Sequence, residues 1–223
     1  MALTGLTVTD MQIFAFVGPA RAGKTTASNY LEEECKERGY YTQRLSFAGP
    51  IKEGCARLGI TKEKDHDEYR ELAQRWGKGR RERNPNHYIR KMGRALQRCA
   101  LVEKGDYALL DKQRNLCCWS ETVVIIDDVR YENEVAALHE LGAHIVLIHP
   151  GESRIDFSEE WRQHESESLA NKICQDEDEL EYFNDLYDGW EVPADSGEEM
   201  MQRVIGIFCD KLWFDSTFPY TQD

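Results

Sequence analysis

The chain has 223 residues, of which 41% are hydrophobic and 31% are charged, and its formal net charge is −13. This size suits one compact domain, or a core domain that carries insertions. The negative charge argues against a general nucleic-acid binder, and no run of ~18 apolar residues predicts a membrane span. The seven scattered cysteines indicate reduced structural thiols in a cytoplasmic protein rather than a zinc site or a disulfide framework.

The first half of the chain begins with a short apolar run, Gln12 to Val17, that predicts a buried strand. A helix is expected from Lys24 to Gly39 and a second strand from Thr42 to Ala48. Helical periodicity without a convincing strand then runs from Pro50 to about Leu116. It is interrupted by the turn-rich stretch from Gly77 to Asn86.

The second half contains the strongest strand signal, Thr122 to Asp127, which is β-branched and apolar until its aspartates. A helix from Tyr131 to Leu141 and a strand from His144 to His149 follow. The acidic stretch from Gln175 to Asp188 is expected to be a solvated helix or loop, and Glu198 to Leu212 an amphipathic helix. Strands that alternate with helices predict an α/β fold with a central parallel sheet and helices on both faces.

A phosphate-binding motif follows the first strand: GPARAGKT, Gly18 to Thr25, matches G-x-x-x-x-G-K-[ST]. Two glycines let backbone N–H groups turn inward on one phosphate, Lys24 reaches the β- and γ-phosphates, and the Thr25 hydroxyl is a ligand for Mg²⁺. The following helix adds its positive dipole end. The motif therefore predicts a nucleoside triphosphate site made by Gly18, Ala20, Arg21, Ala22, Gly23, Lys24, Thr25 and Thr26.

Two aspartates, Asp127 and Asp128, end the strongest strand, where ligands sit in open α/β sheets. A carboxylate there can hold Mg²⁺ through water or accept a proton from an attacking oxygen, and Arg130 is near enough to neutralise phosphate charge. We expect Asp127, together with Thr25, at the Mg²⁺ site. The alternative is that the aspartates cap the following helix, which would stabilise it by ~1 kcal/mol. The pattern does not decide which aspartate is catalytic.

Arginines concentrate in the long segment between the second and third strands, from Arg70 to Arg98. Guanidinium groups bind phosphates bidentately, so this segment is expected to be an acceptor-binding insert. Exposed helix faces explain Arg90, Arg94 and Arg98 better than phosphate binding does. Trp76 lies inside the same segment.

Five segments together resemble a known family. They are GPARAGKTT, SFAGPIKEG, RELAQRWGKGRR, VVIIDDVRYENE with the following LGAHIVLI, and HESE at 164–167. The combination is similar to the deoxynucleoside monophosphate kinases of tailed bacteriophages, which transfer the γ-phosphoryl group of ATP to a dNMP and give dNDP and ADP. The resemblance implies a P-loop kinase fold in a single domain, 1–223. Its core would be about 11–49, 120–150 and 188–215, its acceptor-binding insert about 50–119 and its lid about 150–172.

The resemblance also implies site residues. Lys24, Asp127, Asp128 and Arg130 would be catalytic. The acceptor would be bound by Phe47, Lys52, Arg70, Gln74, Trp76, Arg80, Arg130 and Glu134. The lid arginine that contacts ATP would be Arg154 or Arg162. Family likeness further makes a homodimer in the host cytoplasm reasonable, with ATP and Mg²⁺ as cofactors and no membrane or nucleic-acid partner.

Two rival functions stay open. One is a P-loop kinase for another small phosphorylated metabolite, such as phosphomevalonate. The other is a P-loop NTP-binding regulator or ATPase without an acceptor, which the long acceptor insert disfavours. The base that the acceptor carries cannot be read from the sequence.

Overall fold

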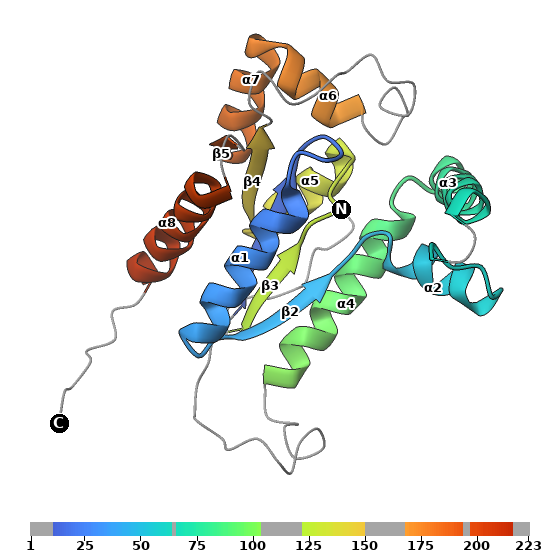
Figure 1. The fold of residues 1–223 in the computed structure, drawn as a ribbon, viewed down its shortest axis with the longest axis horizontal. Helices are drawn as coiled ribbons and strands as arrows, with labels where there is room; N and C mark the ends of the chain where they lie inside the picture. Colours follow the sequence, from blue (N-terminus) through green and yellow to red (C-terminus); the bar gives the residue numbers. More distant parts are fainter. Residues whose placement is uncertain (1–10, 64–65, 104–121, 150–167, 194–196, 216–223) are drawn as a thin grey trace.

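A single parallel sheet organises the computed structural model, which describes residues 11–63, 66–103, 122–149, 168–193 and 197–215 (Figure 1). Its five strands lie in the order β2-β3-β1-β4-β5. They are β1 Met11–Val17, β2 Tyr41–Leu45, β3 Thr122–Ile126, β4 His144–His149 and β5 Trp190–Pro193. The first strand is central, with β3 on one side and β4 on the other. Ligands in such sheets bind at the carboxyl ends of the strands where the strand order reverses, which here is the end of β1.

Eight described helices surround the sheet: α1 Lys24–Glu37, α2 Gly49–Arg57, α3 His66–Arg83, α4 His87–Glu103, α5 Glu132–His139, α6 Ser168–Gln175, α7 Glu177–Tyr187 and α8 Gly197–Asp215. The expected α/β architecture is confirmed. No helix in the described ranges is long and apolar enough to cross a membrane.

The alternation of side chains along β1 divides the core into two layers. Phe14 and Phe16 pack with α1 and α8 on one face of the sheet. Ile13, Ala15 and Val17 pack on the other face, with residues of α2, α4, α5, α6 and α7. Each large apolar side chain buried in this way contributes about 1.5–3 kcal/mol. Both faces of the strand are therefore covered, which explains its unbroken apolar sequence.

Helices α2 and α3 lie beside the sheet, beyond β2, and α4 leads back to the core (Figure 1). Here the turn predicted from Gly77 to Asn86 is confirmed only at residues 84–86, since α3 continues through Gly77 and ends at Arg83. Gly77 is buried, and a Cβ there would lie 3.4 Å from Cδ1 of Ile51 in α2. The glycine thus serves the close packing of two helices, which a local turn pattern cannot distinguish from a break.

Other boundaries differ for similar reasons of tertiary contact. The second strand ends at Leu45 rather than Ala48, because the next three residues turn toward Asp128. The acidic stretch is the helix α7, with Phe183 and Tyr187 buried on one side. Strand β5 was not predicted, because four residues at a sheet edge give too short a pattern.

Candidate functional site

The loop between β1 and α1 has the backbone that the phosphate-binding motif predicts. Gly18, Arg21 and Gly23 all have positive φ, at 147°, 66° and 98°. Gly18 also passes close to β4, since a Cβ on it would lie 2.4 Å from the carbonyl oxygen of Ile148. A strand precedes the loop and a helix begins at its end, so the structural context expected for the motif is confirmed. Positive φ at the non-glycine Arg21 is strain of the kind that collects at ligand sites.

The loop and the first turn of α1 carry the positive charge of Lys24 and the positive end of the helix dipole. Lys24 folds across the loop, and its Nζ donates to the carbonyl oxygens of Gly18 at 2.6 Å and Pro19 at 2.7 Å. Within the described chain, no side chain caps the N-terminus of α1, and its first turn holds no acidic residue. The helix dipole and the ammonium group are therefore both placed to attract an anion. Thr25 and Thr26 are exposed on the same turn.

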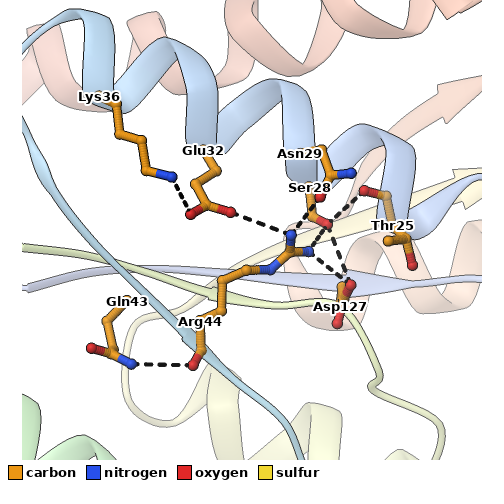
Figure 2. Close-up of polar contacts among 8 residues, drawn as sticks. All are labelled: Thr25, Ser28, Asn29, Glu32, Lys36, Gln43, Arg44 and Asp127. Atoms are coloured by element: carbon orange, nitrogen blue, oxygen red, sulfur yellow. Dashed lines mark hydrogen bonds and ion pairs between the residues drawn. The ribbon is translucent and has the colours of Figure 1, made fainter.

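Asp127 lies next to this turn, because β3 pairs with β1 and ends at its side. Figure 2 shows that Arg44 reaches from β2 to the same place. Its Nη2 lies 2.8 Å from Oδ2 of Asp127, and Ser28 of α1 donates to the same oxygen at 3.4 Å. Ser28 also donates to the carbonyl oxygen of Thr25 at 3.0 Å. The carboxylate is thus tied through Ser28 to the N-terminal part of α1.

Arg44 was not predicted as a site residue. Besides Asp127 it hydrogen-bonds Ser28 and Asn29 and lies 3.3 Å from Glu32, all on α1 (Figure 2). The signal available in the sequence was an arginine inside a strand, which requires an acidic partner when the strand is covered by a helix. No pattern in the sequence indicates that this partner is Asp127.

Asp128 faces the opposite way and holds the start of α2. It accepts hydrogen bonds from the Ser46 hydroxyl at 2.5 Å and from the backbone N–H groups of Phe47 and Ala48 at 2.9 Å each. The alternative that the aspartates cap the following helix is wrong, because the N-cap of α5 is Tyr131 and no side chain of the described residues caps that helix. Asp127 and Asp128 therefore have different tasks, the first at the phosphate loop and the second at the insert.

Glu134 is buried beneath the site, with 2% of its surface exposed. Its carboxylate lies 3.2 Å from Nη2 of Arg81 and accepts the backbone N–H of Arg130 at 3.1 Å. Burial raises the pKa of Glu134, although the charge of Arg81 acts in the opposite direction. The Arg81 guanidinium lies 4.0 Å from the ring centre of Tyr131 and 4.6 Å from that of Tyr88. These contacts join α3 and α4 to the start of α5. The carboxylate of Glu134 therefore makes a structural ion pair with Arg81.

A cavity of about 340 Å³ lies between α2, α3 and α4. Trp76 and Arg80 of α3 line it, as do His87, Tyr88 and Lys91 of α4; Pro50, Ile51 and Gly54 form the wall from α2. Its volume lies within the range of small-molecule sites. Two of the predicted acceptor residues, Trp76 and Arg80, thus meet here.

The remaining predicted acceptor residues do not join them. Phe47 is in the core with 3% of its surface exposed, while Lys52 and Gln74 are exposed on α2 and α3. Arg70 lines a smaller cavity of about 220 Å³ with Lys62, His66 and Tyr69. The side chain of Arg130 is exposed. The two lid candidates, Arg154 and Arg162, lie outside the described residues, as does most of the predicted lid.

No protein-family model matches the chain, and no curated protein matches its sequence. The site must therefore be interpreted from its own geometry.

Proposed function

We propose that the chain is an ATP-dependent deoxynucleoside monophosphate kinase. The observation that carries the proposal is the strand–loop–helix unit with Gly18, Arg21 and Gly23 at positive φ and the Lys24 ammonium folded over the loop. This combination suits a triphosphate, whose oxygens would replace the carbonyls of Gly18 and Pro19 as partners of Lys24. The sequence resemblance supplies the acceptor class.

The residues near the loop fit Mg²⁺. Thr25 offers a hydroxyl oxygen and Asp127 a carboxylate, and both described contacts of Asp127 go to Oδ2. Mg²⁺ commonly keeps several waters and takes few protein ligands beside phosphate oxygens. No cluster of three or more His, Cys, Asp or Glu side chains suited to a metal occurs among the described residues, and such a cluster is not needed here. When bound, the ion would neutralise charge on the phosphates.

Phosphoryl transfer then depends on alignment and charge. An oxygen of the acceptor phosphate attacks the γ-phosphorus, the bond to the β–γ bridging oxygen breaks, and the electron pair leaves with ADP. Lys24 stabilises the negative charge on the transferring group, and the exposed side chain of Arg130 would do the same. Asp128 acts indirectly, because it holds the start of α2 through two backbone N–H groups.

The test is a coupled assay of ADP formation, with ATP and each of dTMP, dGMP, dCMP and dAMP. Acceptor-dependent turnover is expected with at least one of them. Lys24→Ala should lower kcat by ~100-fold or more, the loss typical of a transition-state donor. Lys36→Ala is the matched control, since Lys36 lies on the same helix in an exposed pair with Glu32. Turnover with none of the four overturns the proposal. ADP formation without an acceptor would instead support a P-loop ATPase, and turnover with another phosphorylated metabolite would support a kinase for that metabolite.

With this function we expect a cytoplasmic enzyme that needs no nucleic-acid partner. A homodimer is the oligomeric state that the family resemblance favours.

A further inference from the structure

The cavity between α2, α3 and α4 is positively charged in a chain whose net charge is −13. None of its eight lining residues is acidic. Arg80 and Lys91 are exposed, and neither makes an ion pair with any residue in the described ranges. Arg38, Arg44 and Arg81, in contrast, each pair with a carboxylate. Two cations at one cavity with no acidic partner in the part of the chain that the structure describes indicate a place for an anion.

The surroundings of His87 also favour an anion in this cavity. Burial lowers the pKa of His87, and the nearby charges of Arg80 and Lys91 lower it further, followed by those of Arg81 and Arg90. His87 begins α4, whose first turn has no acidic residue, so the positive end of the helix dipole adds to the same field. The neutral imidazole retains one N–H that can donate to a phosphate oxygen.

The other wall of the cavity is apolar and partly aromatic. Trp76 is 38% exposed, and its indole lies against α2 at Gly54, where a Cβ would come within 2.4 Å of Cζ3 of the ring. Ile51 and Pro50 continue this wall. An exposed indole held against a helix presents a rigid surface on which a planar ring can stack.

We propose that this cavity binds a phosphomonoester that carries a planar ring, with the phosphate held by Arg80, His87 and Lys91. The ring packs against Trp76. This inference rests on the proposed function for the identity of the ligand, which is then the acceptor deoxynucleoside monophosphate. It adds His87 and Lys91 to the acceptor site and removes Arg70 and Gln74 from it.

Their positions around α3 separate Trp76 and Arg80 from Arg70 and Gln74. Trp76 and Arg80 are four residues apart and lie on one side of α3. Arg70 and Gln74 lie on a neighbouring stripe, since ten residues from Arg70 to Arg80 place the two side chains roughly 80° apart around the helix axis. Arg81, on the stripe of Arg70 and Gln74, already pairs with Glu134. Arg70 lines a different cavity.

The test measures binding to the full chain without ATP, so that it does not depend on phosphoryl transfer. Isothermal titration would give the Kd of dTMP, dAMP, dGMP and dCMP, and of 2-deoxyribose 5-phosphate as a probe without a base. Arg80→Gln and Lys91→Gln should each raise the Kd of the bound nucleotide roughly tenfold, the loss of one charge-assisted hydrogen bond. The matched controls are Arg98→Gln, an exposed arginine later on α4, and Arg70→Gln, which removes the rival contact. Neither control should change the Kd more than about twofold.

Trp76→Phe separates the two halves of the site. It should raise the Kd of dTMP and leave the Kd of 2-deoxyribose 5-phosphate unchanged. We expect nucleotide binding to quench tryptophan fluorescence in the wild type, and Trp76→Phe should remove this quenching. Circular dichroism would confirm that the variants fold, as expected for exposed side chains. The inference is overturned if none of the four nucleotides binds, if Arg80→Gln and Lys91→Gln leave the Kd unchanged, or if Arg70→Gln has the larger effect. If binding depends on Arg80 and Lys91 but the coupled assay shows no turnover, the cavity is confirmed as a nucleotide site and the proposed kinase function is refuted.

Discussion

Replacing Arg81 by Met should destabilise the protein strongly, because it leaves the carboxylate of Glu134 buried without a counter-charge. Glu134 is 2% exposed and the Arg81 side chain 19% exposed. Removing one partner of a buried pair costs about 3–5 kcal/mol, and the partial exposure of Arg81 favours the lower end. Methionine keeps apolar contact with Tyr88 and Tyr131 but loses the cation–π attraction, which is worth about 0.5–1 kcal/mol at a partly exposed site. We therefore expect a loss of about 3–4 kcal/mol at pH 7, or a fall in Tm of about 6–16 °C for a chain of this size.

Urea unfolding between pH 5 and pH 8 would separate charge from packing. Burial raises the pKa of Glu134 in the folded protein, so its contribution to stability is fully present below the ordinary pKa of about 4.3 and is lost as pH rises through the raised value. Without Arg81 that pKa rises further. The loss of unfolding free energy caused by Arg81→Met should therefore become smaller as pH falls, since a protonated Glu134 needs no counter-charge.

The double variant Arg81→Met/Glu134→Gln is the control, because glutamine removes the charge and can still accept the N–H of Arg130. It should be more stable than Arg81→Met at pH 8, and the two should converge toward pH 5. The reasoning is refuted if Arg81→Met costs less than about 1 kcal/mol, the value of an exposed pair. It is equally refuted if the two variants keep the same difference in stability at every pH.

Two other predictions concern the contacts of Asp127 and Asp128. Arg44→Gln should lower the free energy of unfolding in urea by about 1.5–3 kcal/mol, because it removes the charged hydrogen bond to Asp127. Arg57→Gln, whose ion pair is exposed, should lower it by less than about 0.5 kcal/mol. Equal losses in the two variants would contradict the argument. Asp128→Ala should speed hydrogen exchange at the amides of Phe47 and Ala48, whereas Asp128→Asn, which keeps an acceptor, should preserve most of their protection. Unchanged exchange in the alanine variant would show that Asp128 does not hold the start of α2.

The sequence alone was sufficient for the parts of this protein that depend on near neighbours in the chain. An apolar strand, a glycine-lysine loop and a helix are consecutive, so the unit from β1 to α1 and the backbone of Gly18 to Thr25 could be predicted from local chemistry. The same holds for β3 and β4, whose continuous apolar runs have few alternatives to a buried strand.

Only the tertiary structure decided the roles of the charged residues. Asp127 and Asp128 are adjacent, yet successive side chains point to opposite sides, so one meets Arg44 beside α1 and the other meets the start of α2. Likewise, Arg80 and Arg81 differ by one position on α3, which places one at the cavity and the other against Glu134. The sequence alone does not distinguish the two residues of each pair, because they are of the same type and adjacent in the chain. Their partners come from segments that are 53 to 83 residues away, and chain folding alone brings these together.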